Sequence, residues 1–287
     1  MGKHSTDIPV SMFRGCRLAL HIFYGLLLAT FYPLLNHTRQ RRTLKTWSRQ
    51  LLTILNIGIQ VEGPQPARGE TGCLLVANHI SWLDIFVLNA IHPSLFIAKS
   101  EVRSWPMIGW LCKRSGTLFI RRGVRQDAAV INHKVSNLLR NGACITLFPE
   151  GTSSDGKQVG HFHSALIQPA IDADVRLCPI ALRYQDASNE LSTAATFTGD
   201  TTLIQSIWNI LRCSQISALV IFTPALLTTK SNRRELARAA QQAIAQELKN
   251  IATPERKPKL ITASQQEILS AQSAYALLVS QVISHLP

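Results

Sequence analysis

Short apolar runs recur along the middle of the chain, separated by longer stretches of mixed character. Each run spans four to six residues and is rich in valine, isoleucine, leucine and phenylalanine: 73–77, 95–98, 117–120, 144–148, 177–182 and 218–222. The runs are continuous and do not alternate with polar residues, a pattern typical of strands that are buried on both faces.

Segments between and after these runs show the period of a helix. The clearest spans 127–141, with its apolar residues on one side and Gly142 just past its end, and another spans 232–250. Strands and helices that alternate at these lengths predict an α/β domain over residues 58–250, with a mostly parallel sheet flanked by helices.

The segment 18–35 carries no charge over 18 residues. A membrane-spanning helix needs about 20 predominantly apolar residues, and His21, Gly25 and Pro33 interrupt this one. Because basic residues flank both ends, we expect it to dip into one leaflet or to lie along a cytoplasmic anionic surface. The alternatives are a buried core helix and a cleaved signal peptide, although no small-x-small cleavage site follows the run.

A second N-terminal helix is predicted over 44–55, where apolar residues and Trp47 recur at helical spacing between basic ones. It can lie on an anionic membrane, pack against the core, or do both. Together the two segments predict an N-terminal membrane-associated helical pair within residues 1–57. At the other end, residues 251–287 are expected to hold a charged, proline-marked linker and a last helix over 264–286 that docks on the body, on a membrane or on another chain.

Charge and cysteine content narrow the classes of partner. The chain has 287 residues, 30 of them Lys or Arg against 17 Asp or Glu, for a formal net charge of +13. Anionic lipid, phosphorylated small molecules and nucleic acid would all suit this excess. The basic residues are spread out, without a helix-turn-helix or stacking-aromatic motif, so nucleic acid is not expected. The 6 cysteines form no CxxC or CxxH pair, which favours reduced, buried thiols over a disulfide framework or a zinc site.

Chemistry-bearing residues follow four of the predicted strands. In an open parallel sheet, functional groups collect just past the carboxyl ends of the strands. The residues at these places are His79, Asp84, Lys99, Arg121, Arg122, Glu150, Gly151 and Thr152.

His79 and Asp84 are the candidate catalytic pair. If His79 ends a strand and Asp84 begins a helix, the turn between them can bring the two side chains together. A carboxylate that accepts from one imidazole nitrogen fixes the tautomer and leaves the other nitrogen as a base. The base would activate a hydroxyl of the substrate itself. A histidine and an aspartate five positions apart are also common by chance, and Ser81, a conceivable nucleophile, lacks the Gly-x-Ser-x-Gly elbow.

The other residues suit a phosphate-bearing substrate. Guanidinium groups match phosphate oxygens bidentately, so Lys99, Arg121 and Arg122 are candidates for a phosphate cradle. The alternative for each arginine is a solvent-facing charge. Glu150 could hold a substrate hydroxyl or orient a basic neighbour, or the turn that it begins could be purely structural.

These stretches together resemble the glycerolipid acyltransferases, and closely the 1-acylglycerol-3-phosphate acyltransferases. Four blocks match in order and spacing over roughly residues 60–185: "NHISWLD", then "KSEVRSWPMIGW" with "GTLFIRR", then "FPEGTSS", and finally "LCPIAL". Four blocks in order are far more specific than any one of them.

The resemblance implies a membrane-bound O-acyltransferase that moves an acyl chain from acyl-CoA or an acyl-carrier protein to lysophosphatidic acid. It implies His79 as general base and Asp84 as its partner, a phosphate site at Lys99 with Arg121 or Arg122, and an acceptor pocket shaped by Glu150 and Gly151. It also implies a place at the cytoplasmic face of the inner membrane. No cofactor is expected beyond the acyl thioester co-substrate, and no metal, since the pair lacks a third ligand at usable spacing.

One departure from the family pattern bears on the acceptor. Where the family usually has Arg and then Ser after Glu-Gly-Thr, this chain has Ser153 and Ser154, followed by Asp155. The stretch is similar to the variant of acyltransferases acting on lyso-ornithine lipid, which is therefore the alternative acceptor. From another class, the alternative is a basic membrane-binding protein without catalysis or a degenerate scaffold, which the intact His-Asp pair argues against.

Overall fold

The computed structural model describes residues 5–66, 72–121 and 125–252. The helix expected over 264–286 and nearly all of the linker expected over 251–260 lie outside the described residues, as does Arg122.

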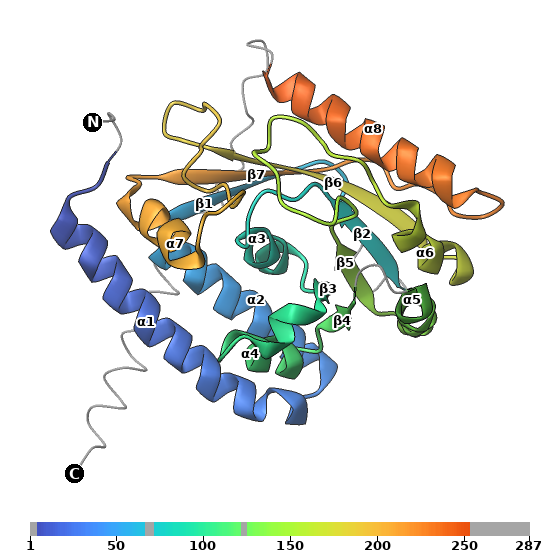
Figure 1. Cartoon of the computed structure of the whole chain (residues 1–287), viewed down its shortest axis with the longest axis horizontal. Helices are drawn as coiled ribbons and strands as arrows, with labels where there is room; N and C mark the ends of the chain where they lie inside the picture. Colours follow the sequence, from blue (N-terminus) through green and yellow to red (C-terminus); the bar gives the residue numbers. More distant parts are fainter. Residues whose placement is uncertain (1–4, 67–71, 122–124, 253–287) are drawn as a thin grey trace. The chain divides into compact units, whose positions relative to one another are not determined.

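A seven-stranded sheet lies at the centre, in the order β1-β7-β6-β2-β5-β3-β4 (Figure 1). Its strands are β1 (Ile57–Glu62), β2 (Cys73–Ala77), β3 (Leu95–Lys99), β4 (Leu118–Ile120), β5 (Cys144–Leu147), β6 (Arg176–Gln185) and β7 (Ile216–Phe222). Every neighbouring pair is parallel except β6 and β7. The predicted α/β fold with a mostly parallel sheet is confirmed, and each predicted apolar run is a strand. The strand β1 was not predicted, because Gly58, Gln60 and Glu62 interrupt its apolar pattern.

Helices cover both faces of the sheet (Figure 1). One face packs against α2 (His37–Ile54), α3 (Asp84–Ile91) and α7 (Leu203–Arg212), and the other against α5 (Arg125–Arg140), α6 (Gln168–Asp172) and α8 (Arg233–Ala252). Successive residues of β2 alternate between the two layers: Leu75 and Ala77 join the first core, Leu74 and Val76 the second. Burial on both faces explains why the strand sequences are continuously apolar.

The two N-terminal helices pack against each other. The helix α1 (Ile8–Phe31) turns through a 3-10 segment, η1 (Tyr32–Leu34), into α2. His21 stacks on the ring of Trp47, with centroids 4.7 Å apart, and its Nε2 lies 3.0 Å from the carbonyl oxygen of Trp47. Gly25 meets the same ring so closely that a Cβ there would lie 2.7 Å from Nε1 of Trp47. Two residues that interrupt the apolar segment in the sequence therefore form the contact with α2.

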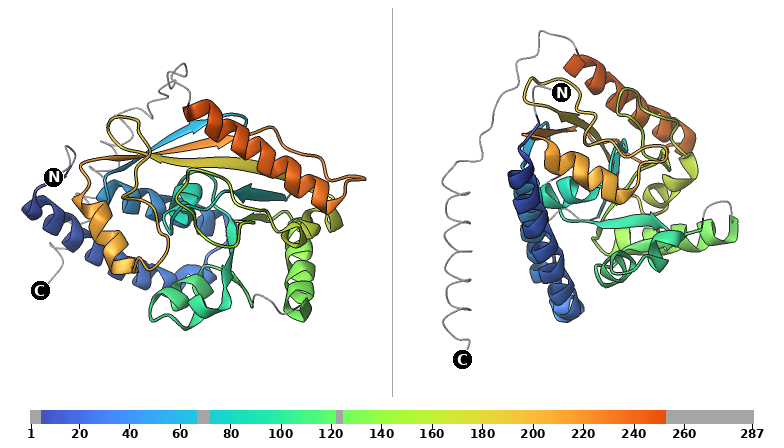
Figure 2. Two further views of the ribbon diagram at one scale, coloured as in Figure 1. Left: turned by 45° about the horizontal axis from the view of Figure 1, so that its top comes forward. Right: turned by 60° about the vertical axis from the view of Figure 1, so that its left-hand side comes forward.

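The opposite face of α1 is apolar and exposed. Figure 2 shows α1 along the outside of the body. Its inward side is lined by small or polar residues and one leucine, and its outward side by large apolar ones: Phe13, Leu20, Phe23, Tyr24, Leu27 and Phe31. The span Ile8–Leu34 has the length and composition of a membrane-crossing helix; an 18-residue window within it has a mean hydropathy of 1.3, and 22% of that window is buried in the protein. By contrast, α2 buries Leu51, Leu52 and Ile54 in the core.

Three short helical elements complete the fold of the described residues. They are η2 (Ser100–Ser104), α4 (Ile108–Arg114) and η3 (Ser164–Leu166). Arg114, at the end of α4, donates to the carbonyl oxygens of Ala29 and Thr30, so it satisfies two acceptors in the last turn of α1.

The expectation of reduced cysteines is wrong for one pair. Cys73 on β2 and Cys144 on β5 are register partners with Cα atoms 4.9 Å apart, and their sulfurs are bonded. The two residues are separated by 71 positions in the sequence. Only the pairing of the strands brings them together, so spacing along the chain could not have predicted the bond.

Candidate active site

The carboxyl ends of four neighbouring parallel strands meet at one edge of the sheet. The strands β2, β5, β3 and β4 lie side by side in that order and point the same way. The residues that follow them are therefore gathered on one edge, as the sequence predicted from the general rule for open α/β sheets.

At the centre of this edge, His79 and Asp84 contact each other. Nδ1 of His79 lies 2.8 Å from Oδ2 of Asp84. The carboxylate is an acceptor, so Nδ1 carries the proton and Nε2 presents its lone pair. No other described residue bonds to Nε2. The imidazole is 22% exposed and the carboxylate is fully buried, so this nitrogen is open to a reactant while its partner is shielded from water.

Asp84 is held by donors from two directions. Its Oδ2 also accepts from the backbone N–H groups of Ile80 and Ser81, at 2.7 and 3.0 Å. Its Oδ1 accepts from the hydroxyl of Tyr184 on β6, at 2.7 Å. Asp84 begins α3, where the N-terminal end of the helix also favours a negative charge. These four donors replace the hydrogen bonds to water that the buried carboxylate lacks.

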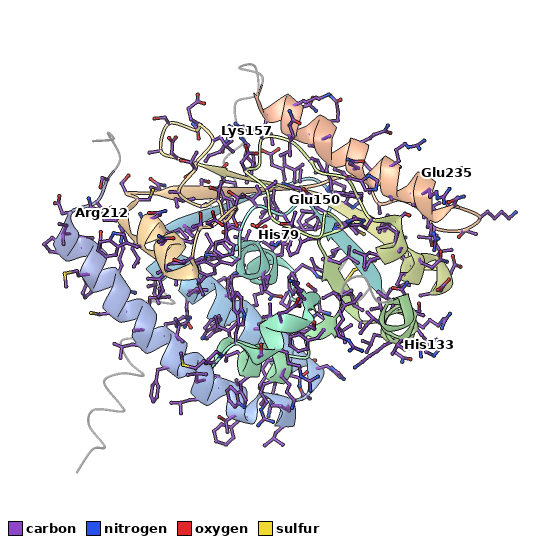
Figure 3. All side chains as sticks on the ribbon, viewed as in Figure 1. His79, His133, Glu150, Lys157, Arg212 and Glu235 are labelled. Carbon is purple, nitrogen blue, oxygen red and sulfur yellow. A yellow bond between two sulfur atoms is a disulfide. The ribbon has the colours of Figure 1, made fainter. Side chains whose placement is uncertain are left out.

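Residues after β5 support His79 from the other side. The ring of Phe148 stacks on the imidazole, with centroids 4.1 Å apart and planes at 12°. Oε1 of Glu150 accepts from the backbone N–H of His79 at 2.9 Å, and Oε2 accepts from the backbone N–H of Gly160 at 2.9 Å. Figure 3 shows His79 and Glu150 together in the middle of the molecule. Glu150 thus joins the loops after β2 and β5.

Burial raises the pKa of Glu150 above its ordinary value, while the hydrogen bonds from the backbones of His79 and Gly160 oppose that rise. The nearby charge of Asp84 also raises it. Because both of its oxygens are engaged by backbone donors, Glu150 is suited to fixing the loop that carries His79.

The backbone around the pair is tightly fixed. Asn78 exchanges two hydrogen bonds with the backbone of Leu182, at 2.7 and 3.0 Å, which joins the end of β2 to β6. Gly151 has a φ of 76° and closes a turn onto the carbonyl oxygen of Phe148, a conformation that favours glycine. Thr152 is exposed on the same turn.

The structure does not bring Lys99 into contact with His79. The side chain of Lys99 is 46% exposed and pairs with Glu101 at 2.8 Å. Arg121 is exposed just past β4. Arg122 lies outside the described residues.

Two further observations limit the chemistry. Ser81 is fully buried, and its Oγ has no hydrogen-bond partner in the described part of the chain, so it is out of reach of a substrate. Within the described ranges, no group of three or more His, Cys, Asp or Glu side chains is arranged to hold a metal ion. The arrangement can therefore take a proton from a hydroxyl brought to Nε2 of His79.

Comparisons with known proteins identify the family of this chain. The sequence model of the Acyltransferase family matches residues 58–183. A lyso-ornithine lipid O-acyltransferase of Pseudomonas aeruginosa is 35% identical over 85% of this chain and 95% of its own length. A 1-acyl-sn-glycerol-3-phosphate acyltransferase of Neisseria meningitidis is 38% identical over 77% of this chain and 86% of its own length. The chain belongs to the glycerolipid acyltransferase family.

This membership confirms the resemblance drawn from the four sequence blocks, and it makes the chain an acyltransferase of the 1-acylglycerol-3-phosphate acyltransferase type. The fold agrees too. The crystal structure of the 1-acyl-sn-glycerophosphate (LPA) acyltransferase PlsC of Thermotoga maritima matches with a TM-score of 0.61 at 20% identity, over 85% of this chain and 100% of the other.

Sequence reasoning missed three residues of this acyltransferase site: Tyr184, Phe148 and Gly160. One signal pointed to Tyr184. It continues the alternation of Cys178, Ile180 and Leu182, whose side chains face the same core as α3. A hydroxyl at the end of that series had to find a partner on that side of the sheet.

Proposed function

We propose that this enzyme transfers an acyl chain from an acyl thioester to the free hydroxyl of lysophosphatidic acid and so forms phosphatidic acid. In this mechanism Nε2 of His79 removes the proton of the hydroxyl as its oxygen attacks the thioester carbonyl. The carbon–sulfur bond breaks, the leaving thiolate takes the proton back from the imidazolium of His79 and departs as the thiol, and no acyl-enzyme forms. Asp84 fixes the tautomer and stabilises the imidazolium. The one observation that carries the proposal is the contact between Nδ1 of His79 and Oδ2 of Asp84.

For the acceptor, a phosphate headgroup suits the basic residues after β3 and β4. Lys99 ends β3 and Arg121 follows β4, at the same edge of the sheet as His79; both are exposed, and Arg122 comes next in the chain. We assign these three residues to the phosphate, and Glu150, Gly151 and Thr152 to the wall of the acceptor pocket. A relative of Neisseria meningitidis named for 1-acyl-sn-glycerol-3-phosphate supports this choice.

Lyso-ornithine lipid is the second candidate acceptor. The stretch after Glu150 has Ser153 where the family usually has arginine, and it adds the exposed carboxylate of Asp155. The charge of Asp155 is directed toward Lys157, whose Nζ lies 3.4 Å away. A zwitterionic headgroup with an ammonium would tolerate this site better than a doubly charged phosphate. The relative of Pseudomonas aeruginosa carries that substrate in its name.

The acyl donor is acyl-CoA or an acyl-carrier protein, and we propose that no other cofactor takes part. The thioester supplies the activated acyl group, and the histidine supplies the base, so neither a redox group nor a metal is needed for the balance of the reaction.

We further propose that the outward face of α1 enters the cytoplasmic leaflet of the inner membrane. Exposed aromatic and large apolar residues on two adjacent elements extend this face: Trp105, Met107 and Trp110 around α4, and Ile204 and Trp208 on α7. Both α4 and α7 pack against α1. Tryptophans at the edge of an apolar surface suit the headgroup region of a bilayer, and the lysolipid acceptor resides in that bilayer.

A competition assay tests the proposal. Purified full-length protein in detergent is offered lysophosphatidic acid and lyso-ornithine lipid together, once with acyl-CoA and once with acyl-carrier protein. Phosphatidic acid as the main product would support the first acceptor. Acylated ornithine lipid as the main product would replace it with the second, and transfer to neither would refute the proposed reaction.

A further inference from the structure

The hydroxyl of Tyr184 and the carboxylate of Asp84 form a buried contact that the four family blocks do not include. The residues are 100 positions apart, and the hydroxyl lies 2.7 Å from Oδ1. Tyr184 is 1% exposed and Asp84 is 0% exposed. Contacts between such buried polar groups are strong because little water competes for either partner.

The phenol can act only as a donor here. Burial raises the pKa of Tyr184 well above its ordinary value, and the neighbouring charge of Asp84 adds to that rise. The hydroxyl therefore keeps its proton over the whole range in which an enzyme works, and it offers that proton to Oδ1 at every such pH.

The two oxygens of Asp84 are anchored by different parts of the fold. Oδ2 accepts from the backbone of the loop that leads into α3 and from His79, and among the described residues only Tyr184 donates to Oδ1. Without that hydroxyl, one oxygen of a buried carboxylate would have no partner, and the group could turn about its Cβ–Cγ bond. Tyr184 also ties the start of α3 to β6.

We propose that Tyr184 is a positioning residue for the acyl transfer, because its hydroxyl fixes the plane of the Asp84 carboxylate and limits how tightly the His79–Asp84 pair binds a proton. This inference rests on the proposed role of His79 as general base. Donation to Oδ1 withdraws charge from the carboxylate, so the imidazole loses its extra proton more easily and remains a free base to lower pH. Two other described titratable side chains interact with the pair: Tyr184 on β6 contacts Asp84, and the charge of Glu150, after β5, interacts with both His79 and Asp84.

The substitution Tyr184→Phe removes the hydroxyl and keeps the ring. Full-length wild type, Tyr184→Phe and a control, Thr223→Val, are compared in detergent with acyl-CoA and each lysolipid. The control removes another buried hydroxyl that also contacts β6, since Oγ1 of Thr223, just past β7, donates to the carbonyl oxygen of Pro179 at 3.2 Å without touching Asp84. We measure kcat/KM from about pH 5 to about pH 9, the range that covers the acid limb of a histidine base.

For Tyr184→Phe we expect the acid limb of the profile to move up by about one pH unit, with kcat/KM about tenfold lower on that limb, as loss of one hydrogen bond to a charged group predicts. The activity should recover toward that of wild type at high pH. Thr223→Val should keep the wild-type profile. An unchanged profile, or a loss of activity that is equal at every pH, would overturn the proposal.

A second pair of measurements separates this inference from the proposed function. Replacing Tyr184 with 3-fluorotyrosine keeps the contact and strengthens the donor, so the acid limb should move to lower pH. A move to higher pH, or no move, would contradict the proposed role of Tyr184. The titration of His79 is also followed by NMR of ¹⁵N-histidine protein, with its signal assigned by its loss in His79→Gln. If wild type acylated neither lysolipid, the proposed function would fail, whereas equal NMR midpoints in wild type and Tyr184→Phe would refute the role of Tyr184.

Discussion

Nδ1 of His79 lies 2.8 Å from Oδ2 of Asp84, although five residues along one straight helix would turn the two side chains about 140° apart. The contact forms because His79 follows a strand and Asp84 begins a helix, and the backbone N–H groups of Ile80 and Ser81 bind the same oxygen. The loop between the two residues therefore wraps around the carboxylate.

His79→Ala should lower kcat by about 10²- to 10⁴-fold, the usual contribution of a general base, because no other described side chain is placed to take the proton. The fold should persist, since the imidazole is partly exposed and its partner keeps three other donors. Initial rates and circular dichroism test this. The control is His133→Ala, an exposed histidine on α5 far from the site in Figure 3. Wild-type turnover by His79→Ala would remove residue 79 from the mechanism.

Asp84→Asn should inactivate the enzyme and also destabilise it by about 2–4 kcal/mol, because an amide nitrogen placed among buried donors leaves polar groups unpaired. Unfolding by urea, followed by tryptophan fluorescence in detergent, measures the change. Asp172→Asn, at an exposed position on α6, is the matched control and should stay within about 0.5 kcal/mol of wild type. A fully stable Asp84→Asn protein would mean that the four donors do not require a carboxylate.

Ser153→Arg should improve the use of lysophosphatidic acid about fivefold to tenfold over lyso-ornithine lipid, the gain expected of one charge-assisted hydrogen bond to phosphate. The side chain of Ser153 now donates to the carbonyl oxygen of Phe197, beside the turn that carries Glu150. The ratio of kcat/KM for the two acceptors measures the effect. Asn137→Arg, on α5, adds the same charge at a distant surface. An unchanged ratio would show that position 153 does not contact the headgroup.

Replacing Leu20, Phe23 and Leu27 with serine should release the protein from anionic liposomes in a flotation assay. These side chains are 68%, 60% and 52% exposed on the outward face of α1, and burying each in lipid should contribute about 1.5–3 kcal/mol. Val130→Ser is the control, because Val130 is 67% exposed on α5, in the layer across the sheet. Flotation of the triple variant with the liposomes would contradict insertion of α1.

His92 predicts a pH dependence of stability. Burial, with the charges of Arg41 and Lys45, lowers the pKa of His92 to about 4. The unfolded chain takes up this proton near the ordinary value of 6.5. Above about pH 6.5, His92 is neutral in both the folded and the unfolded chain and has no effect on the pH dependence. As the pH falls from about 6.5 toward 4, the unfolded chain binds the proton first, and the free energy of unfolding decreases by about 2–3 kcal/mol.

His92→Gln should remove that part of the acid sensitivity. The measurement is the difference in unfolding free energy between about pH 7 and about pH 4.5, which should be smaller in the variant than in wild type. The exposed His133→Gln serves as control. Equal acid sensitivity of wild type and His92→Gln would show that residue 92 is protonated in the folded protein.

The sequence alone determined the strands β2, β5, β3 and β4 and the residues at their carboxyl ends. Continuous apolar runs identify strands buried on both faces, and in a parallel sheet such strands share one carboxyl edge. That is why the sequence assigns His79, Lys99, Arg121 and Glu150 to one edge of the sheet. The edge strand β1 escaped because its partly polar residues lack that signal.

The tertiary structure alone decided which distant residues meet. The hydroxyl that binds Asp84 comes from Tyr184, and the thiol that joins Cys73 comes from Cys144. Likewise, α2 decides which face of α1 is turned toward the protein. Trp47 packs against His21 and Gly25, so the large apolar side chains of α1 lie on its exposed face. Local patterns report whether a residue will be buried, because burial depends on the polarity of its own neighbourhood in the chain. They do not report its partner, because strand order and helix packing are set by the free energy of the whole fold.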